Sequence, residues 1–267
     1  MQEKEISDVV ERRFKTIHKL LHKIMKDFDA DDIHSFRIEV KKIRAFLRLV
    51  DFEKKVDGPL IPKQLKRLYG YIGIVRNIHL HRHSVFKYIT NNKIEEPSAY
   101  IEMLGKEKSH WQKEAADLME KNNFKDAEEK IIKHLPDELD KSSIKAFVKN
   151  KLDRLKEQLK DMNNDDAIHS IRKILKDILY NLEIIKDHAD LPEIIAKEED
   201  LKSLTSMLGD FRDKCIELEF LEPEYLDKIK DPQENTRLQQ IKNDFEKDKQ
   251  FIKQQLQKNL KKLQDQL

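Results

Sequence analysis

Five cationic or ionisable side chains recur at helical spacing in one short stretch of the chain: His34, Arg37, Lys41, Arg44 and Arg48. At about 100° per residue they fall on one helix face, in a stripe roughly 80° wide and about 21 Å long. Like charges at such spacings repel each other and destabilise a helix by about 0.2–0.5 kcal/mol per pair. Arginine offers phosphate a forked pair of donors, and lysine offers it a point charge. The uninterrupted stripe therefore indicates a bound polyanion.

The stripe has a second copy, formed by His169, Arg172 and Lys176, at an offset of 135 positions. An internal repeat of this kind indicates a fold built from two similar units. The copy is shorter, because three basic positions change: Lys42 to Asp177, Arg44 to Leu179 and Arg48 to Glu183. We therefore expect the two repeats to bind an anion unequally.

A second helical pattern also repeats. Lys66, Gly73 and Arg76 share one helix face, and their counterparts follow 136 positions later: Lys202, Gly209 and Arg212. A glycine inside a helix costs up to about 1 kcal/mol relative to alanine. Close approach of a neighbouring helix or of a ligand backbone would each explain a glycine at this repeat position.

Charge is distributed unevenly along the chain. Residues 33–88 carry 13 Lys and Arg against 4 Asp and Glu, a net charge of +9, whereas the whole chain has a net charge of +2. The remainder therefore carries −7. A concentrated basic segment in an otherwise acidic chain favours an anionic partner.

The composition predicts an all-α protein. The chain has 267 residues with only 5 Gly and 7 Pro, and 39% of its residues are charged, which excludes sandwiches, barrels and nucleotide-binding α/β folds. A break at Pro136 predicts a first repeat over 1–136 and a second over 137–267. Short connections favour antiparallel neighbours, so we expect two pseudo-twofold-related bundles of four or five helices around a basic central channel. The predicted helices are 3–28, 32–51, 60–91, 97–121, 124–134, 138–161, 165–188, 191–221 and 233–265.

Other candidate sites are weaker. His79, His81 and His83 lie close in sequence, but only the first and last share a helix face, whereas a zinc site normally needs three or four converging ligands. The single cysteine, Cys215, excludes an intramolecular disulfide. The sequence has no Gly-rich phosphate loop and no nucleophile elbow. We therefore expect no metal, no cofactor and no enzymatic activity.

The location of the protein is also an expectation. The first residues are charged rather than apolar. No apolar run approaches the roughly 20 residues that a transmembrane helix needs. We expect a cytoplasmic protein without a membrane partner.

Two motifs together carry a family resemblance. The run His34-x-x-Arg37-x-x-x-Lys41-Lys42-x-Arg44 is followed by Ile72-Gly73-x-x-Arg76-Asn77, and both have counterparts in the second repeat. This arrangement resembles the CHAD family, the conserved histidine α-helical domain, over roughly residues 5–265. The resemblance implies two pseudo-symmetric bundles around a basic channel that binds inorganic polyphosphate. It implies binding by His34, Arg37, Lys41, Lys42, Arg44, Lys66, Arg76, His169, Arg172, Lys176, Lys202 and Arg212, to which the charge pattern adds Arg48, Lys63 and Arg67.

The sequence leaves three functions open, which experiments can distinguish. The first is non-catalytic polyphosphate binding, with polyphosphate granules as an extended partner and affinity rising as His34 and His169 gain protons near pH 6.5. The second is a nucleic-acid or storage-granule scaffold. Aromatic residues are only 7% of the chain and are not interleaved with the basic stripe, which disfavours base stacking. The third is an accessory part of a polyphosphate-metabolising enzyme.

Overall fold

The computed structural model describes residues 1–54, 61–122, 124–192 and 197–267. These residues form helices and no strand, so the all-α prediction is confirmed. In chain order the helices are α1 (Glu3–Asp27), α2 (Ala30–Lys54), α3 (Lys63–Asn92), α4 (Ser98–Lys121), α5 (Lys125–Ile132), α6 (Lys141–Leu159), α7 (Asp165–Ile185), α9 (Glu198–Glu219), α10 (Pro223–Leu226) and α11 (Pro232–Gln266).

Most predicted helices agree with these bounds to within a few residues. Residue 60, the predicted start of the third helix, lies outside the described residues, and so do residues 193–196 of the helix predicted over 191–221. The short helix α10 follows α9 where the sequence predicted a connection. Its first residue is Pro223, which has no backbone N–H to leave unpaired in a first turn.

Polar side chains set the starts of the two helices that carry the basic stripes. At α2, Asp29 Oδ1 accepts hydrogen bonds from the backbone N–H groups of Asp31 and Asp32, at 2.9 and 3.0 Å. At α7, Asn164 Oδ1 accepts from the backbone N–H of Asp166 at 2.9 Å. Such contacts pair backbone donors that have no partner within the helix. The start of each of these two helices is therefore fixed, and with it the position of the basic stripe that the helix carries.

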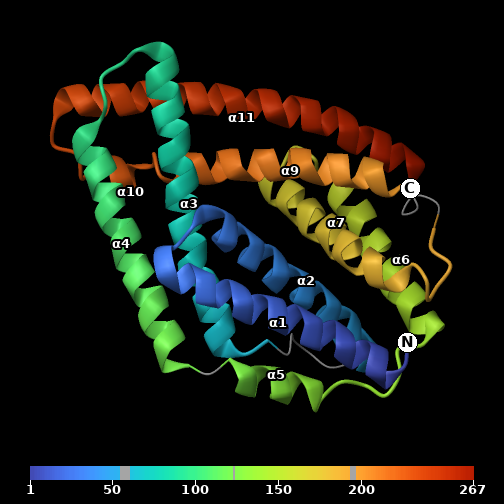
Figure 1. Ribbon diagram of the computed structural model, residues 1–267. Coiled ribbons are helices and arrows are strands. Elements are labelled where there is room, and N and C mark those ends of the chain that lie inside the picture. The colour runs from blue at the N-terminus through green and yellow to red at the C-terminus, as the bar shows by residue number, and fades with distance from the viewer. Residues whose placement is uncertain (55–60, 123, 193–196) are drawn as a thin grey trace.

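The helices of the two repeats pack in the same order (Figure 1). In the first repeat α1 packs on α2, α2 on α3 and α3 on α4, whereas in the second α6 packs on α7, α7 on α9 and α9 on α11. The repeats meet where α2 contacts α7 and α3 contacts α9. This interface brings the helices with the repeated basic motifs side by side.

The hydrophobic core crosses the repeat boundary. One cluster of buried side chains includes Phe36 and Leu68 from the first repeat and Ile171 and Leu208 from the second. A buried amide fixes the interface further, because Asn181 Nδ2 on α7 donates to the backbone carbonyl of Ala45 on α2 at 3.0 Å. The two sequence repeats thus share one core, while the division at residue 136 stays a prediction.

Candidate functional site

A cavity of about 620 Å³ lies at the interface of the two repeats, and we call it the central cavity. Side chains of α2, α3, α6, α7 and α9 line it. Eleven of them are Lys or Arg and two are Asp, which gives a net charge of +9. The cationic residues are Arg37, Lys41, Arg44, Arg48, Arg76, Lys151, Arg154, Arg172, Lys173, Lys176 and Arg212.

The structure brings together nine of the fifteen residues that the sequence selected. Both repeats contribute to this set: Arg37, Lys41, Arg44, Arg48, Arg76, His169, Arg172, Lys176 and Arg212. The core stripes of α2 and α7 are buried against neighbouring helices, and this packing turns their basic stripes toward a common space. A cation density of this kind creates a strongly positive local potential.

Four further predicted residues lie outside the cavity lining. Lys63, Lys66 and Arg67 are exposed on α3, and the Arg67 guanidinium lies 5.3 Å from the centre of the Tyr71 ring. Lys202 is held near the start of α9, where its Nζ lies 2.8 Å from Glu198 Oε1 and 3.0 Å from Glu199 Oε1. The hydrogen bonds that Lys202 Nζ donates to Glu198 and Glu199 raise the pKa of Lys202 to about 12.

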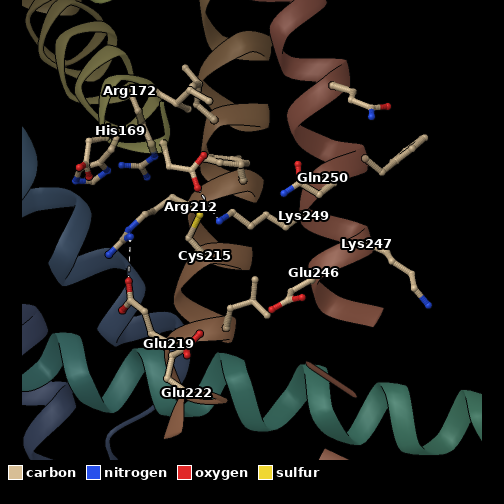
Figure 2. Close-up of a pocket in the computed structure, with 18 of the residues that line it drawn as sticks. His169, Arg172, Arg212, Cys215, Glu219, Glu222, Glu246, Lys247, Lys249 and Gln250 are labelled. Carbon is tan, nitrogen blue, oxygen red and sulfur yellow. Dashed lines mark ion pairs between the residues drawn. The ribbon is translucent and has the colours of Figure 1, made fainter. Parts of the chain in front are cut away.

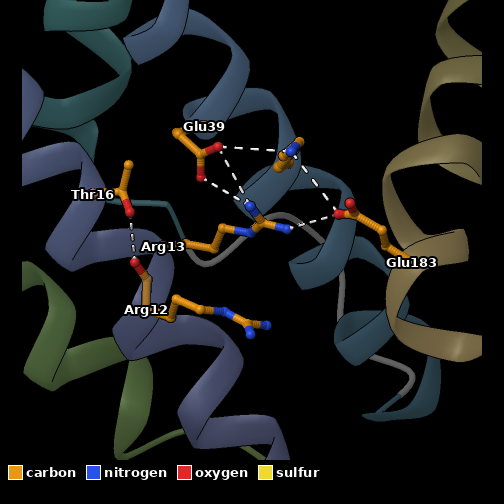
Figure 3. Close-up of polar contacts among 6 residues, drawn as sticks. Arg12, Arg13, Thr16, Glu39 and Glu183 are labelled. Atoms are coloured by element: carbon orange, nitrogen blue, oxygen red, sulfur yellow. Dashed lines mark hydrogen bonds and ion pairs between the residues drawn. The ribbon is translucent and has the colours of Figure 1, made fainter.

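Lys42 also lies outside the cavity lining, in an ion-pair network between α1, α2 and α7. Figure 3 labels Arg13, Glu39 and Glu183 of this network. Lys42 Nζ lies 3.8 Å from Glu39 Oε1 and 3.9 Å from Glu183 Oε2. Arg13 contacts the same two carboxylates, with Nη1 3.1 Å from Glu39 Oε2 and Nη2 3.4 Å from Glu183 Oε2. The charge of Lys42 is therefore shared with carboxylates from both repeats.

The sequence reasoning missed the contribution of α6. Lys151 and Arg154 line the cavity from this helix, and Lys173 and Tyr180 line it from α7. The spacing of Lys151 and Arg154 places them on one face of the helix predicted over 138–161. That spacing was the available signal, but only the packing of α6 on α7 shows which face meets the cavity.

Two carboxylates anchor cations within the cavity. Asp177 on α7 accepts from Arg48 Nε at 3.0 Å and from Lys151 Nζ at 2.8 Å, and Arg48 Nη2 also contacts it. Asp213 on α9 accepts from both terminal nitrogens of Arg76, each at 3.2 Å. These pairs join the two repeats and remove two carboxylates from competition for other cations.

Arg37 and Arg172 differ from these paired cations. Arg37 Nη1 donates to the backbone carbonyl of Tyr69 at 3.0 Å, and its guanidinium lies 4.3 Å from the centre of the Tyr69 ring. The Nε atoms of Arg37 and Arg172 are buried without a hydrogen-bond partner among the described residues, and so is His169 Nδ1. Buried donors are normally paired. The two repeats therefore each place an unpaired guanidinium Nε donor beside the central cavity.

Gly73 makes room for Arg37. A Cβ atom at position 73 would collide with Arg37 Nη1 and would lie 3.2 Å from Arg37 Cζ. The close approach expected here therefore comes from a side chain, and not from a helix backbone or a ligand. At Gly209, the repeat counterpart, a Cβ would meet no atom within 4 Å, so close approach does not explain that glycine.

Burial, together with the crowding of cations, lowers several pKa values. Burial, followed by the positive charges of Arg37, Arg172 and other neighbours, lowers the pKa of Lys41 to about 7. Burial and the charges of Lys173 and Arg212 lower the pKa of His169 to about 4. Near neutral pH the cavity therefore holds less positive charge than its composition suggests.

His34 lies near the cavity but outside its lining. Burial lowers its pKa below the usual 6.5, and the charges of Arg76 and Lys41 lower it further. The expectation that His34 and His169 titrate near pH 6.5 therefore needs correction for the anion-free protein, because both pKa values lie below that point. Burial and the neighbouring cations instead bring the pKa of Lys41 close to neutral pH.

Two further features concern the described part of the chain alone. Within it, no group of three or more His, Cys, Asp or Glu side chains is placed to hold a metal ion. His81, one of the three clustered histidines, is instead buried, with Nε2 2.6 Å from Tyr100 Oη. No helix among the described residues is long and apolar enough to span a bilayer.

Comparison with known proteins places this geometry in a family. No curated protein is significantly similar to the chain in sequence. The crystal structure of a CHAD domain from the plant Ricinus communis is 14% identical, with a TM-score of 0.76 over 97% of this chain and 91% of that one. PptA from Streptomyces chartreusis is 12% identical, with a TM-score of 0.63 over 96% of this chain and 98% of that one.

At these identities the likeness to both structures is one of fold. The sequence model of the CHAD domain matches residues 8–222. This range contains every helix that lines the central cavity, from α2 to α9. Because this sequence match covers far more than half of the 267 residues and includes both copies of the repeated basic motifs, the chain belongs to the CHAD domain family.

Proposed function

We propose that the protein binds inorganic polyphosphate, without chemical turnover, in the central cavity. One observation carries the proposal: Arg37 and Arg172, which are repeat counterparts, both reach the cavity with buried Nε donors that lack partners. Phosphate oxygens accept charge-assisted hydrogen bonds of this type, which are stronger than those between neutral groups. A linear chain of phosphates would pair with donors of both repeats at once.

The surrounding charge favours a chain of phosphates over a single anion. Eleven Lys and Arg side chains from five helices line the cavity, and its two carboxylates already pair with Arg48, Lys151 and Arg76. A single phosphate group would satisfy only a few of the remaining cations. Successive phosphates of a polymer would neutralise cations along the whole cavity and release their counterions.

The two tyrosines of the cavity disfavour a nucleic acid as the ligand. The Tyr69 ring has the guanidinium carbon of Arg37 4.3 Å and that of Arg44 5.7 Å from its centre. The Tyr180 ring has Lys176 Nζ 5.6 Å from its centre. Since cations already contact these rings, they offer little free surface for base stacking. As a further part of this proposal, we place the protein in the cytoplasm and in association with polyphosphate granules.

The test is isothermal titration calorimetry with polyphosphate and with single-stranded RNA of equal charge. The variant Arg37→Glu/Arg172→Glu loses two charge-assisted contacts of about 1.5–3 kcal/mol each, so we expect its affinity for polyphosphate to fall at least about 100-fold. The matched control, Arg12→Glu/Lys19→Glu, makes the same charge change on exposed positions of α1 and should bind within a few-fold of the unchanged protein.

Three outcomes would contradict the proposal. One is equal binding by the two double variants while circular dichroism shows the same helicity. Another is tighter binding of RNA than of polyphosphate, which would favour the nucleic-acid scaffold. Release of phosphate from polyphosphate during incubation would show catalysis.

A further inference from the structure

Lys41 is a half-buried lysine of the central cavity that has no anionic partner. Its Nζ makes no hydrogen bond and no ion pair within the part of the chain that the structure describes. Lys151, another lysine of the cavity, instead lies 2.8 Å from Asp177 Oδ2. No carboxylate therefore holds the Lys41 side chain in its charged form, and burial with the neighbouring cations lowers its pKa to about 7.

A lysine in this state is a nucleophile. Because its pKa lies near 7, about half of the Lys41 side chains are neutral amines at pH 7, compared with about 0.04% of lysines with the usual pKa of about 10.4. Loss of solvent and a neighbouring positive charge are the two means by which proteins activate lysine for attack on a carbonyl carbon. Lys41 has both, and it faces a cavity that a small molecule can enter.

The groups around Lys41 select the kind of electrophile that can reach it. Arg37 lies one turn earlier on α2, Arg76 lies on α3, and α7 contributes Arg172 and Lys176. Each of these cations lies close enough that its charge lowers the pKa of Lys41. The two carboxylates of the cavity are already paired with other cations. Because a guanidinium binds phosphate through a forked pair of donors, the arrangement favours an electrophile that carries a phosphate group.

The larger cavity nearby does not compete for such a molecule. It has a volume of about 1230 Å³, lies between α7, α9 and α11, and shares His169, Arg172 and Arg212 with the central cavity (Figure 2). Five carboxylates and four Lys or Arg side chains line it, and Figure 2 marks the pairing of Arg212 with Glu219 at 3.1 Å. It thus lacks a positive excess, so a small anion should concentrate in the central cavity beside Lys41.

We propose that Lys41 is a site of covalent modification, at which a small acyl phosphate transfers its acyl group to Nζ. The nitrogen lone pair attacks the carbonyl carbon and forms the C–N bond of an amide. The bond from that carbon to the bridging oxygen breaks, and the leaving phosphate takes its electron pair and the proton that the nitrogen loses. Acylation removes the positive charge of Lys41 and therefore weakens polyphosphate binding. The phosphate contacts rest on the proposed function, because the same cations serve both ligands.

The experiment incubates the full chain with acetyl phosphate at pH 7 and follows the acetylation of each lysine by mass spectrometry of its peptides. The reference is Lys149, which is exposed on α6. The neutral amine is roughly 1000-fold more abundant at a pKa of about 7 than at the usual value, and the weaker nucleophilicity of such an amine offsets part of this gain. We expect Lys41 to react at least about tenfold faster than Lys149, and added polyphosphate to slow the reaction at Lys41 only, of these two.

Variants test the phosphate contacts and the consequence of the modification. Arg172→Gln should slow the acetylation of Lys41, whereas Arg12→Gln, at an exposed position of α1, should not. Lys41→Arg keeps the positive charge and cannot be acetylated under these conditions. Treatment with acetyl phosphate should therefore lower the affinity of the unchanged protein for polyphosphate, in calorimetry, and leave that of Lys41→Arg within a few-fold.

The outcomes separate this inference from the proposed function. Acetylation of Lys41 no faster than that of Lys149 would overturn the inference and leave polyphosphate binding intact. An equally large preference for Lys41 with the neutral donor 4-nitrophenyl acetate would also overturn it, because the phosphate group would then have no part in the reaction. Fast acetylation of Lys41 that depends on Arg172, in a protein that does not bind polyphosphate, would support the modification site and refute the proposed function.

Discussion

Replacing Gly73 by alanine should weaken polyphosphate binding, because it displaces Arg37. The added Cβ would collide with Arg37 Nη1, so the guanidinium must move. It would lose the 3.0 Å hydrogen bond to the carbonyl of Tyr69 and its position 4.3 Å from the centre of the Tyr69 ring. The unpaired Nε of Arg37 would move with it, away from the position in which it can meet an anion.

The size of the effect follows from these contacts. The charge-assisted hydrogen bond that Arg37 Nε would make with the anion contributes about 1.5–3 kcal/mol, and its loss corresponds to a roughly 10- to 150-fold loss of affinity for Gly73→Ala. The free energy of unfolding should change little. Alanine gains up to about 1 kcal/mol over glycine in a helix, and the lost contacts of Arg37 offset this gain.

Gly209→Ala is the matched control, because its Cβ would meet no atom within 4 Å. This variant should keep its affinity for polyphosphate and gain up to about 1 kcal/mol in the free energy of unfolding. Calorimetry measures the affinities, and urea denaturation measures the stabilities. If Gly73→Ala bound polyphosphate as tightly as Gly209→Ala, Arg37 would have no part in binding from its observed position.

The remaining predictions concern pH, salt and an ion pair. The pKa of Lys41 is lowered to about 7, and a bound anion should raise it again. Affinity for polyphosphate should therefore fall as pH rises from 7 to 9, by up to about tenfold per pH unit. Lys41→Met should flatten this profile in calorimetry. Between pH 7 and 10.5 the unfolded chain binds more protons at Lys41 than the folded protein does. The free energy of unfolding without ligand should therefore rise with pH in that window. A fall attributable to Lys41 would refute the lowered pKa of this residue. The logarithm of the dissociation constant should increase linearly with the logarithm of salt concentration between about 50 and 500 mM, whereas a flat response would exclude ionic binding. Asp177→Asn should lower the free energy of unfolding by about 3 kcal/mol, because it leaves Arg48 and Lys151 without their shared carboxylate, and should also tighten polyphosphate binding. Asp190→Asn, which removes an exposed pair with Lys145, should change neither quantity measurably in the same assays.

Part of the candidate site could be predicted because helical periodicity is local. A period of 3.6 residues places Arg37, Lys41 and Arg44 on one face, whatever the rest of the chain does. The apolar residues of the same helix mark the opposite face as the one that packs. The repeat then extends this reasoning from the first stripe to Arg172 and Lys176. All five residues line the central cavity.

The pairing of the acids in the second repeat could not be predicted in this way. Asp177 and Glu183 stand at the repeat positions of Lys42 and Arg48, and from sequence they indicated a weaker second stripe. In the structure Asp177 pairs with Arg48, and Glu183 lies 3.9 Å from Lys42. The two acids therefore act as ion-pair partners of first-repeat cations across the interface between α2 and α7.

The roles of Lys66 and Lys202 were also beyond sequence reasoning. The two lysines are repeat counterparts, and each lies on a basic helix face. In the structure both are exposed and lie outside the lining of the central cavity. Lys202 meets Glu198 and Glu199 on its own helix. A helical wheel shows which residues share a face, but it does not show how far along the helix the neighbouring elements enclose that face.

The sequence by itself determined the all-α fold class, the two repeats and the basic faces of their helices, because composition and helical period depend on neighbouring residues in the chain. Only the tertiary structure decided which cations enclose a common space, which of them carboxylates neutralise, and that Arg37 occupies the room left by Gly73. Those properties depend on contacts between residues more than 25 positions apart. Electrostatic energies change steeply with burial and distance, and neither quantity is defined until the helices pack.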